Sequence, residues 1–175
     1  VRVTGGEPLV RQGVYDFLAE LNHMAGLEDV SLTTNGVLLK ANIERLQQAG
    51  VRRLNDSLDT LSREKYRRVT GFDRFDTVWE GIRLALEAGF APIKINAVAL
   101  IGVNDDELLD LARLSLAYPL HVRFIEFMPI GKSRLNTDQL LLTAEIRRRL
   151  SALGPLTPVG QGASDGPARR LPFAA

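Results

Sequence analysis

The chain has 175 residues, of which 45% are hydrophobic and 25% are charged, a composition typical of one globular domain with an apolar core. Its 22 basic and 21 acidic residues leave a net charge of +1, which excludes a general attraction to nucleic acid or to an anionic membrane. No apolar run approaches the ~20 residues of a membrane span and no signal segment opens the sequence, so we expect a cytoplasmic protein.

Short β-branched runs alternate with segments of helical period along the chain. Strands are expected at 1–4, 30–34, 53–58, 93–100 and 121–127. Between them, apolar residues recur with helical spacing at 14–21, 43–49, 78–86 and 108–116. This alternation predicts an α/β fold with a parallel sheet, either doubly wound or part of a (β/α) barrel.

Local signals mark the ends of the helices. Three helical runs stop at an Ala-Gly pair, where glycine can take the left-handed conformation that closes a helix: Gly26, Gly50 and Gly89. The expected N-caps are Ser62, Thr143 and either Asn104 or Asp105. The predicted core therefore covers 1–153, and a Gly/Pro-rich tail covers 154–175.

The first strand ends in the turn Gly5-Gly6-Glu7-Pro8. Two glycines let a ligand approach the backbone, and the proline fixes the exit of the chain. In both candidate folds, ligands gather at the carboxyl ends of the strands. The turn is therefore a candidate ligand site, and a tight turn with an exposed glutamate is the alternative.

Polar residues also mark the next two strands. The second strand ends in Thr33-Thr34-Asn35-Gly36, which offers hydroxyl and amide groups. By strand alternation, Asn55, Ser57 and Asp59 share one polar face of the third strand. Asp56 falls on the opposite face between leucines, where an unpaired carboxylate is costly. We expect Asp56 either to be paired or to weaken the strand.

Cations lie in the remaining strands. Lys94 and Asn96 share one face of an apolar run, and a buried ammonium needs an anion, either a ligand phosphate or an acidic residue of a neighbouring strand. Arg123 and Glu126 lie on opposite faces of the last expected strand, so at most one of them points to the same side of the sheet as Lys94. Arg2 is expected to add a second cation that forks onto the same anion.

Five motifs together resemble the GTP 3′,8-cyclase family of radical S-adenosylmethionine (SAM) enzymes. They are Arg2–Leu9, Leu32–Gly36, Asn55–Asp59, Pro92–Asn96 and Arg123–Gly131. The Gly-Gly-Glu-Pro turn is shared widely among radical SAM enzymes, whereas Arg-Phe-Ile-Glu-Phe-Met-Pro with Lys-Ile-Asn is typical of the cyclase. The similarity runs from Val1 to about Gly131. The segment Asp165–Pro172 is similar to the lead-in to the family's C-terminal cluster region.

The resemblance implies a partial radical SAM (β/α) barrel and roles for individual residues. Gly5, Gly6 and Glu7 would hold the amino-acid part of SAM, mostly through backbone groups. Ser57 would contact SAM, and the backbone of Met128 would meet its adenine.

The resemblance likewise implies that Arg2, Thr33 and Lys94 bind GTP, and that Arg123 is a further polar residue near the substrate. The implied reaction is reductive cleavage of SAM at a [4Fe–4S] cluster, hydrogen abstraction from the ribose of GTP, and cyclisation onto the guanine. The product is the cyclic pterin precursor of molybdenum cofactor.

The chain contains no cysteine, so no cluster can be ligated by thiolates within it. Its two histidines, His23 and His121, are expected to be surface or core residues. The resemblance implies one cluster from a C-x₃-C-x₂-C loop upstream of Val1 and a second beyond Ala175. We therefore expect an internal fragment that is inactive alone.

Two departures from the family pattern limit the resemblance. Asp56 stands where the family usually has an apolar residue, and Lys132–Asn136 replaces an aromatic-bearing loop. Alternatives are another radical SAM enzyme with a different substrate, or a cluster-free nucleotide-binding paralogue. The expected partners are GTP and the next enzyme of the molybdenum cofactor pathway, with a homodimer left open.

Overall fold

The computed structural model describes residues 1–128, 137–160 and 169–172. The strands are β1 (Arg2–Val3), β2 (Ser31–Thr34), β3 (Arg53–Ser57), β4 (Ile93–Ala99) and β5 (Leu120–Glu126). The α-helices are α1 (Val14–His23), α2 (Leu39–Gln48), α3 (Arg63–Thr70), α4 (Phe75–Glu87), α5 (Leu108–Ala117) and α6 (Thr143–Leu150). Short 3₁₀ helices are η1 (Pro8–Val10), η2 (Thr137–Gln139) and η3 (Ser151–Leu153). The expected alternation of strands and helices is confirmed.

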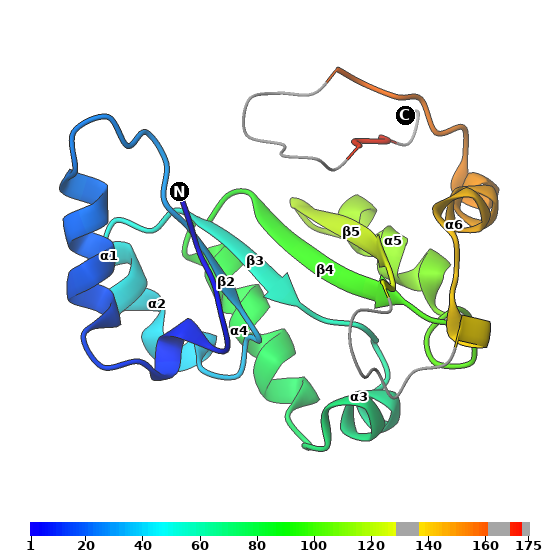
Figure 1. Ribbon diagram of the computed structural model, residues 1–175, viewed down its shortest axis with the longest axis horizontal. Coiled ribbons are helices and arrows are strands. Elements are labelled where there is room, and N and C mark those ends of the chain that lie inside the picture. Colours follow the sequence, from blue (N-terminus) through cyan, green and yellow to red (C-terminus); the bar gives the residue numbers. More distant parts are fainter. Residues whose placement is uncertain (129–136, 161–168, 173–175) are drawn as a thin grey trace.

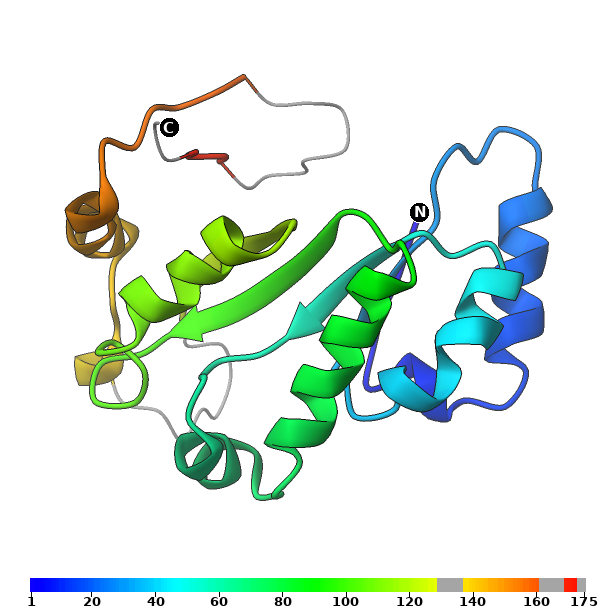
Figure 2. The same cartoon turned by 180° about the vertical axis from the view of Figure 1, so that it is seen from behind.

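The sheet is parallel throughout, with the strand order β1-β2-β3-β4-β5. A doubly wound sheet would reverse its strand order at a switch point, and this sheet does not. Successive right-handed crossovers in one direction place the helices on one face. Figure 1 shows α2 and α4 behind the sheet, and Figure 2 shows them in front of it from the other side. The fold is therefore a partial (β/α) barrel.

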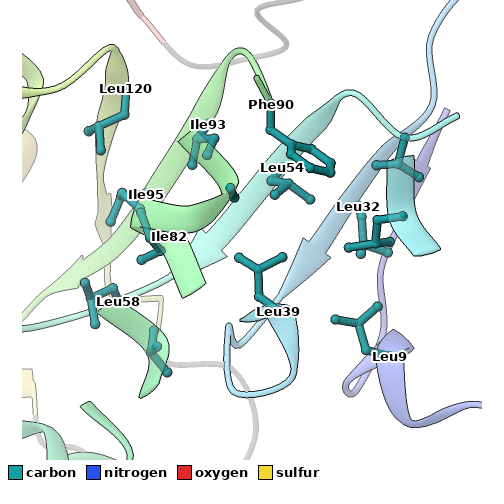
Figure 3. Close-up of a cluster of buried hydrophobic side chains, with 14 of the residues drawn as sticks. Leu9, Leu32, Leu39, Leu54, Leu58, Ile82, Phe90, Ile93, Ile95 and Leu120 are labelled. Atoms are coloured by element: carbon teal, nitrogen blue, oxygen red, sulfur yellow. The ribbon is translucent and has the colours of Figure 1, made fainter. Parts of the chain in front are cut away.

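The main core lies between the sheet and this helix layer (Figure 3). Leu32, Leu54, Ile93 and Leu120 occupy one register row and are at most 2% exposed. The helices cover them with buried side chains, among which are Leu18, Leu39, Leu46, Val78 and Ile82. Burial of these apolar residues, at about 25 cal/mol per Å², is the main force that holds the helices on the sheet.

A second apolar cluster lies at the β5 end of the sheet, where α6 packs on α5. It contains Ala99, Leu108, Ala112, Leu141, Ile146 and Leu150. The last described helix is therefore anchored to the same sheet as the others.

The predicted helix ends are partly confirmed. Gly50 and Gly89 have φ of +79° and +85° and directly follow the last residues of α2 and α4, as expected for left-handed residues that close a helix. Gly26 is also left-handed, with φ of +86°, but α1 already ends at His23 and its C-cap Met24 is extended, so the predicted helix end at Gly26 is wrong. Ser62 caps α3, since its hydroxyl accepts a hydrogen bond from the Lys65 N–H at 3.4 Å.

Two N-cap predictions are wrong. Helix α5 follows Glu107, and the Asn104 side chain instead bonds to the carbonyl of Asp59 after β3, to the carbonyl of Val98 in β4 and to the N–H of Leu100. Thr143 is the first residue of α6, and its N–H donates to the carboxylate of Glu126. In both cases a tertiary contact replaces the local cap.

The described part of the tail, 154–160 and 169–172, forms no helix or extended strand. The N–H of Val159 donates to the carbonyl of Arg170 at 3.4 Å, which brings the two tail segments together. Among the described residues, no helix is long and apolar enough to span a bilayer.

Candidate functional site

The face of the sheet opposite the helices is polar. Side chains at paired positions of parallel strands point to the same side, so the register arranges this face in rows. The first row holds Arg2, Ser31 and Arg53. The second holds Thr33, Asn55, Lys94 and His121, and the third holds Ser57, Asn96 and Arg123. We call these ten residues the polar face.

Lys94 is the most enclosed cation of the polar face, with only 3% of its surface exposed. Its register neighbours are Asn55 on β3 and His121 on β5, and neither is acidic. Asn55 is also 3% exposed, and its amide donates to the Leu32 carbonyl at 3.4 Å. Lys94 is therefore a buried cation in the middle of a row of hydrogen-bonding side chains.

The register shows which of the two charged side chains of β5, Arg123 or Glu126, shares a face of the sheet with Lys94. Arg123 lies opposite Asn96 and therefore belongs to the polar face, whereas Glu126 points to the helix side, where it receives the Thr143 N–H. His121 also belongs to the polar face, and we did not assign it there from sequence. The signal was present, since His121 precedes Arg123 by two residues in one strand.

Arg2 is separated from the other predicted GTP-binding cation. It lies on the edge strand β1, one row below Lys94, with β2 and β3 between them. At ~4.8 Å per strand, the two strands are roughly 14 Å apart. The side chains of Arg2 and Lys94 therefore do not lie side by side. A single ligand could contact both only if it reached across β2 and β3.

The Gly5-Gly6 turn is open. Its glycines have φ of +104° and +43°, and a Cβ added at either would meet no atom within 4 Å. A cavity of about 770 Å³ lies between this turn and the first turn of α1. The peptide groups of the turn are therefore accessible to a ligand at the carboxyl end of β1.

The side chain of Glu7 holds this turn against the end of β2. One carboxylate oxygen accepts from the Leu9 N–H at 3.1 Å and from the Thr34 hydroxyl at 2.9 Å. The other accepts from the Asn35 N–H at 2.6 Å. Glu7 therefore positions the open turn, and its own carboxylate is engaged within the fold.

Asp56 lies outside the polar face, on the helix side of β3, and is fully buried. Neither of its carboxylate oxygens has a hydrogen-bond partner among the described residues. Burial, followed by the nearby charge of Glu7, raises the pKa of Asp56 well above its usual value, and the neighbouring Ser57 N–H opposes the shift. The expectation that Asp56 is paired is therefore not met.

A side-chain clamp joins the carboxyl ends of β3 and β4. The Asn104 amide donates to the carbonyls of Asp59 at 2.6 Å and Val98 at 2.9 Å, and its oxygen accepts from the Leu100 N–H at 2.8 Å. The Asp59 carboxylate accepts from the Val98 N–H at 2.8 Å. Burial raises the pKa of Asp59, and this hydrogen bond opposes the shift. The clamp fixes the edge of the sheet where Ser57 is exposed.

Ser57 ends β3 on the polar face, and Met128 follows β5 with 67% of its surface exposed. The end of the last motif, Pro129–Gly131, and the departing loop Lys132–Asn136 lie outside the described residues. Within the described ranges, no group of three His, Cys, Asp or Glu side chains is placed to hold a metal ion.

Sequence comparison places this chain among known proteins. A family model described as "Radical SAM superfamily" matches residues 1–115. The GTP 3′,8-cyclase of Moorella thermoacetica is 48% identical over 168 residues, which are 96% of this chain and 52% of that protein. The GTP 3′,8-cyclase of Heliobacterium modesticaldum is 56% identical over 132 residues, 75% of this chain and 40% of that protein. The chain spans about half the length of the curated relatives it matches.

Structural comparison supports the fold alone. A crystallised domain of pyruvate-formate lyase-activating enzyme from Bacteroides vulgatus has a TM-score of 0.68 and 18% identity, covering 87% of this chain and 91% of that one. At this level of identity the shared feature is the arrangement of strands and helices.

Proposed function

The chain belongs to the radical SAM superfamily, and on that premise we propose that it is part of a GTP 3′,8-cyclase, which rearranges GTP toward the cyclic pterin precursor of molybdenum cofactor. The observation that carries the proposal is the combination of an open Gly-Gly turn after β1 with a buried lysine on the polar face. Relatives named GTP 3′,8-cyclase support the choice of substrate.

The residues at the carboxyl ends of the strands fit SAM. Gly5 and Gly6 leave their peptide groups open beside a cavity, and they would hold the amino-acid part of SAM through those groups. Glu7 would keep this turn in place, and the exposed hydroxyl of Ser57 would contact SAM from β3. The backbone of Met128 would meet the adenine. When bound, SAM together with a [4Fe–4S] cluster supplies the radical chemistry.

The residues of this chain do not fit the cluster itself. Thiolates hold such clusters, and the chain has no cysteine. We therefore assign no step to the cluster here, and we propose that its ligands come from outside these 175 residues. The role of this chain in the reaction is to bind and orient SAM and GTP.

The amino-terminal rows of the polar face would bind GTP. Lys94 would place its charge against a phosphate, and the Thr33 hydroxyl would donate from the same row. Arg123 would add a second cation from the next row of β5. Arg2 would reach the nucleotide from the opposite edge of the sheet.

Separate titrations of the full-length protein with SAM and with GTP test this assignment. Substitution of Lys94→Gln should weaken GTP binding about tenfold or more, because a charge-assisted contact is lost, and should leave SAM binding unchanged. Ser57→Ala should weaken SAM binding and should leave GTP binding unchanged. If Lys94→Gln binds GTP as tightly as the wild type, the substrate assignment is wrong.

The same titrations distinguish the alternatives. Binding of SAM without GTP would favour a radical SAM enzyme with a different substrate. Binding of GTP without SAM, in a protein whose coding sequence has no C-x₃-C-x₂-C motif, would favour a cluster-free paralogue.

We further propose that the protein works in the cytoplasm, forms a homodimer and passes its product to the next enzyme of the molybdenum cofactor pathway. Light scattering after size-exclusion chromatography measures the mass that tests the dimer. A monomeric mass at micromolar concentration would rule it out.

A further inference from the structure

The buried carboxyl group of Asp56 lies near the side chains that hold the glycine turn after β1. Asp56 is the register partner of Thr34 on β2, and the Thr34 hydroxyl donates to the carboxylate of Glu7 at 2.9 Å. The same carboxylate accepts from the N–H groups of Leu9 and Asn35. Asp56 is therefore a direct neighbour of the network that keeps this turn in place.

Neutral groups face Asp56 from β2, β4 and α4. Thr34 and Ile95 are its register partners on the two neighbouring strands. A Cβ added at Gly36 would lie 2.7 Å from Cγ1 of Val78 and 2.8 Å and 2.9 Å from the two carboxylate oxygens of Asp56. Neither of these oxygens has a hydrogen-bond partner among the described residues, so little in this environment stabilises the ionised form.

Two titratable groups of the described residues interact with Asp56, Glu7 from the turn and Tyr66 from α3. Burial, followed by the charge of Asp56, raises the pKa of Tyr66, so this phenol stays neutral around pH 7. Burial, followed by the charge of Glu7, raises the pKa of Asp56. Ionisation of Asp56 therefore places a second negative charge near the carboxylate of Glu7.

Glu7 is the member of this pair that can move. Asp56 has no exposed surface, whereas Glu7 is partly exposed. A Cβ added at Gly5 or Gly6 would meet no atom within 4 Å, and Glu7 itself lines the cavity of about 770 Å³ beside the turn. Repulsion from an ionised Asp56 is therefore relieved when Glu7 turns toward this space and leaves its hydrogen bonds to the turn.

We propose that Asp56 is a positioning residue for SAM, and that its protonation controls whether Glu7 holds the glycine turn. With Asp56 neutral, the turn is held and SAM binds. With Asp56 ionised, Glu7 is released and SAM binds more weakly. The inference rests on the proposed function, because it takes the turn as part of the SAM site. Binding of SAM and binding of the Asp56 proton then strengthen each other.

Calorimetric titration of the full-length protein with SAM, from about pH 6 to about pH 9, tests this coupling. The α-amino group of SAM itself titrates near pH 8, so the wild type is compared with Asp56→Asn, which is neutral at every pH. Because Asp56 loses its proton as the pH rises, the wild type should bind SAM about five- to tenfold more weakly than Asp56→Asn at the highest pH, and equally at the lowest.

The matched control is Asp59→Asn. Asp59 follows β3, and burial raises the pKa of its carboxyl group as well, but this carboxylate accepts from the Val98 N–H at 2.8 Å. An asparagine oxygen keeps that hydrogen bond. The pH profile of SAM binding to Asp59→Asn should therefore run parallel to that of the wild type.

Hydrogen exchange of the protein without SAM provides a second measurement. The N–H groups of Leu9 and Asn35 both donate to Glu7, so their protection reports whether this carboxylate is in place. Relative to Asp56→Asn, the wild type should lose about five- to tenfold of this protection as the pH rises. The Val98 N–H, which donates to Asp59, should keep its protection in both proteins. A role for Asp56 in packing alone would not produce this pH-dependent loss.

The outcomes separate this inference from the proposed function. If the wild type and Asp56→Asn bind SAM with the same pH dependence, Asp56 does not control the turn, and the proposed function stands. If neither protein binds SAM but Leu9 and Asn35 lose protection with pH only in the wild type, the control of Glu7 is supported and the SAM assignment is refuted. Thermal unfolding checks the fold of each variant, and Asp56→Val, which is also neutral at every pH, carries the comparison if Asp56→Asn unfolds early.

Discussion

Replacing Asp56 with valine should make the protein more stable. The side chain is fully buried on the helix side of β3, between Thr34 and Ile95 of the neighbouring strands. Neither carboxylate oxygen is hydrogen-bonded within the described part of the chain. Valine suits a strand position that is covered on this side by helices, and it removes both unpaired oxygens.

The size of the effect follows from two contributions. An unpaired buried polar group costs about 1–3 kcal/mol, and a buried valine side chain contributes about 1.5 kcal/mol. Some of this gain is lost, because valine ends one bond short of the carboxylate oxygens, which lie beside Gly36. A net gain of about 2–3 kcal/mol at neutral pH should raise the Tm by roughly 4–12 °C.

The effect should also depend on pH. Burial and the charge of Glu7 raise the pKa of Asp56, so the folded protein holds this proton more tightly than the unfolded chain does. Wild-type stability is therefore fully retained below the unfolded pKa of about 4, and it falls as the pH rises through the raised folded pKa. Valine does not titrate, so the advantage of Asp56→Val should be smallest near pH 4 and largest near pH 8.

Urea and thermal unfolding followed by circular dichroism at several pH values measure this difference. The matched control is Thr34→Val, the register partner of Asp56, which is equally enclosed but donates to Glu7. That substitution should lose about 1 kcal/mol. If Asp56→Val unfolds at a lower temperature than the wild type at pH 8, or if its advantage does not grow with pH, the reasoning is wrong.

Four further substitutions test other parts of the structure. Glu7→Gln replaces one hydrogen-bond acceptor of the turn with a donor, so it should lower the free energy of unfolding by about 1–2 kcal/mol. In calorimetric titrations, the same variant should bind SAM more weakly and GTP as tightly as the wild type. Gly36→Ala should cost about 2–4 kcal/mol in urea unfolding, because φ is +76° and the new Cβ would lie 2.7 Å from a neighbouring side chain. Gly89→Ala, at φ +85° with no atom within 4 Å, should cost only about 1–2 kcal/mol, and equal losses at both glycines would contradict the steric argument. Asn104→Ala removes three hydrogen bonds and should cost about 2–4 kcal/mol by the same measurement, whereas a loss below about 0.5 kcal/mol would show that the clamp contributes little.

Periodicity was sufficient to locate the strands and the main helices. Alternation also placed Lys94 with Asn96 and Asn55 with Ser57 on common faces, and the register confirms both pairs. The similarity to GTP 3′,8-cyclases, expected from five short motifs, is confirmed by curated relatives of that name. These features could be predicted because they depend on residues close together in the chain.

Strand order and side-chain partners could not be predicted in the same way. The pattern left open a doubly wound sheet and a barrel, since both arise from repeated βα units. Only the register between β4 and β5 shows that Arg123, and not Glu126, shares a face of the sheet with Lys94. Asn104 was one of two candidates for a helix cap, whereas its amide joins Asp59 and Val98, which come together only in the folded protein.

The position of the tail residues was the feature least predictable from the sequence. Arg169 and Arg170 follow a Gly/Pro-rich segment with no period, so nothing in their order predicts that they line the same cavity as Lys94. Pocket-lining residues in irregular segments are found only from the tertiary structure.

The separation of the sheet into one apolar and one polar face limits how this sequence can change in length. Loss of a single residue within β3 would turn Leu54 to the polar face or Asn55 into the helix layer, and a deletion within β4 would do the same to Ile93 or Lys94. Such a deletion would damage the core and the polar face at once. We therefore expect insertions and deletions among functional relatives to occur in the loops and to be rare within these two strands.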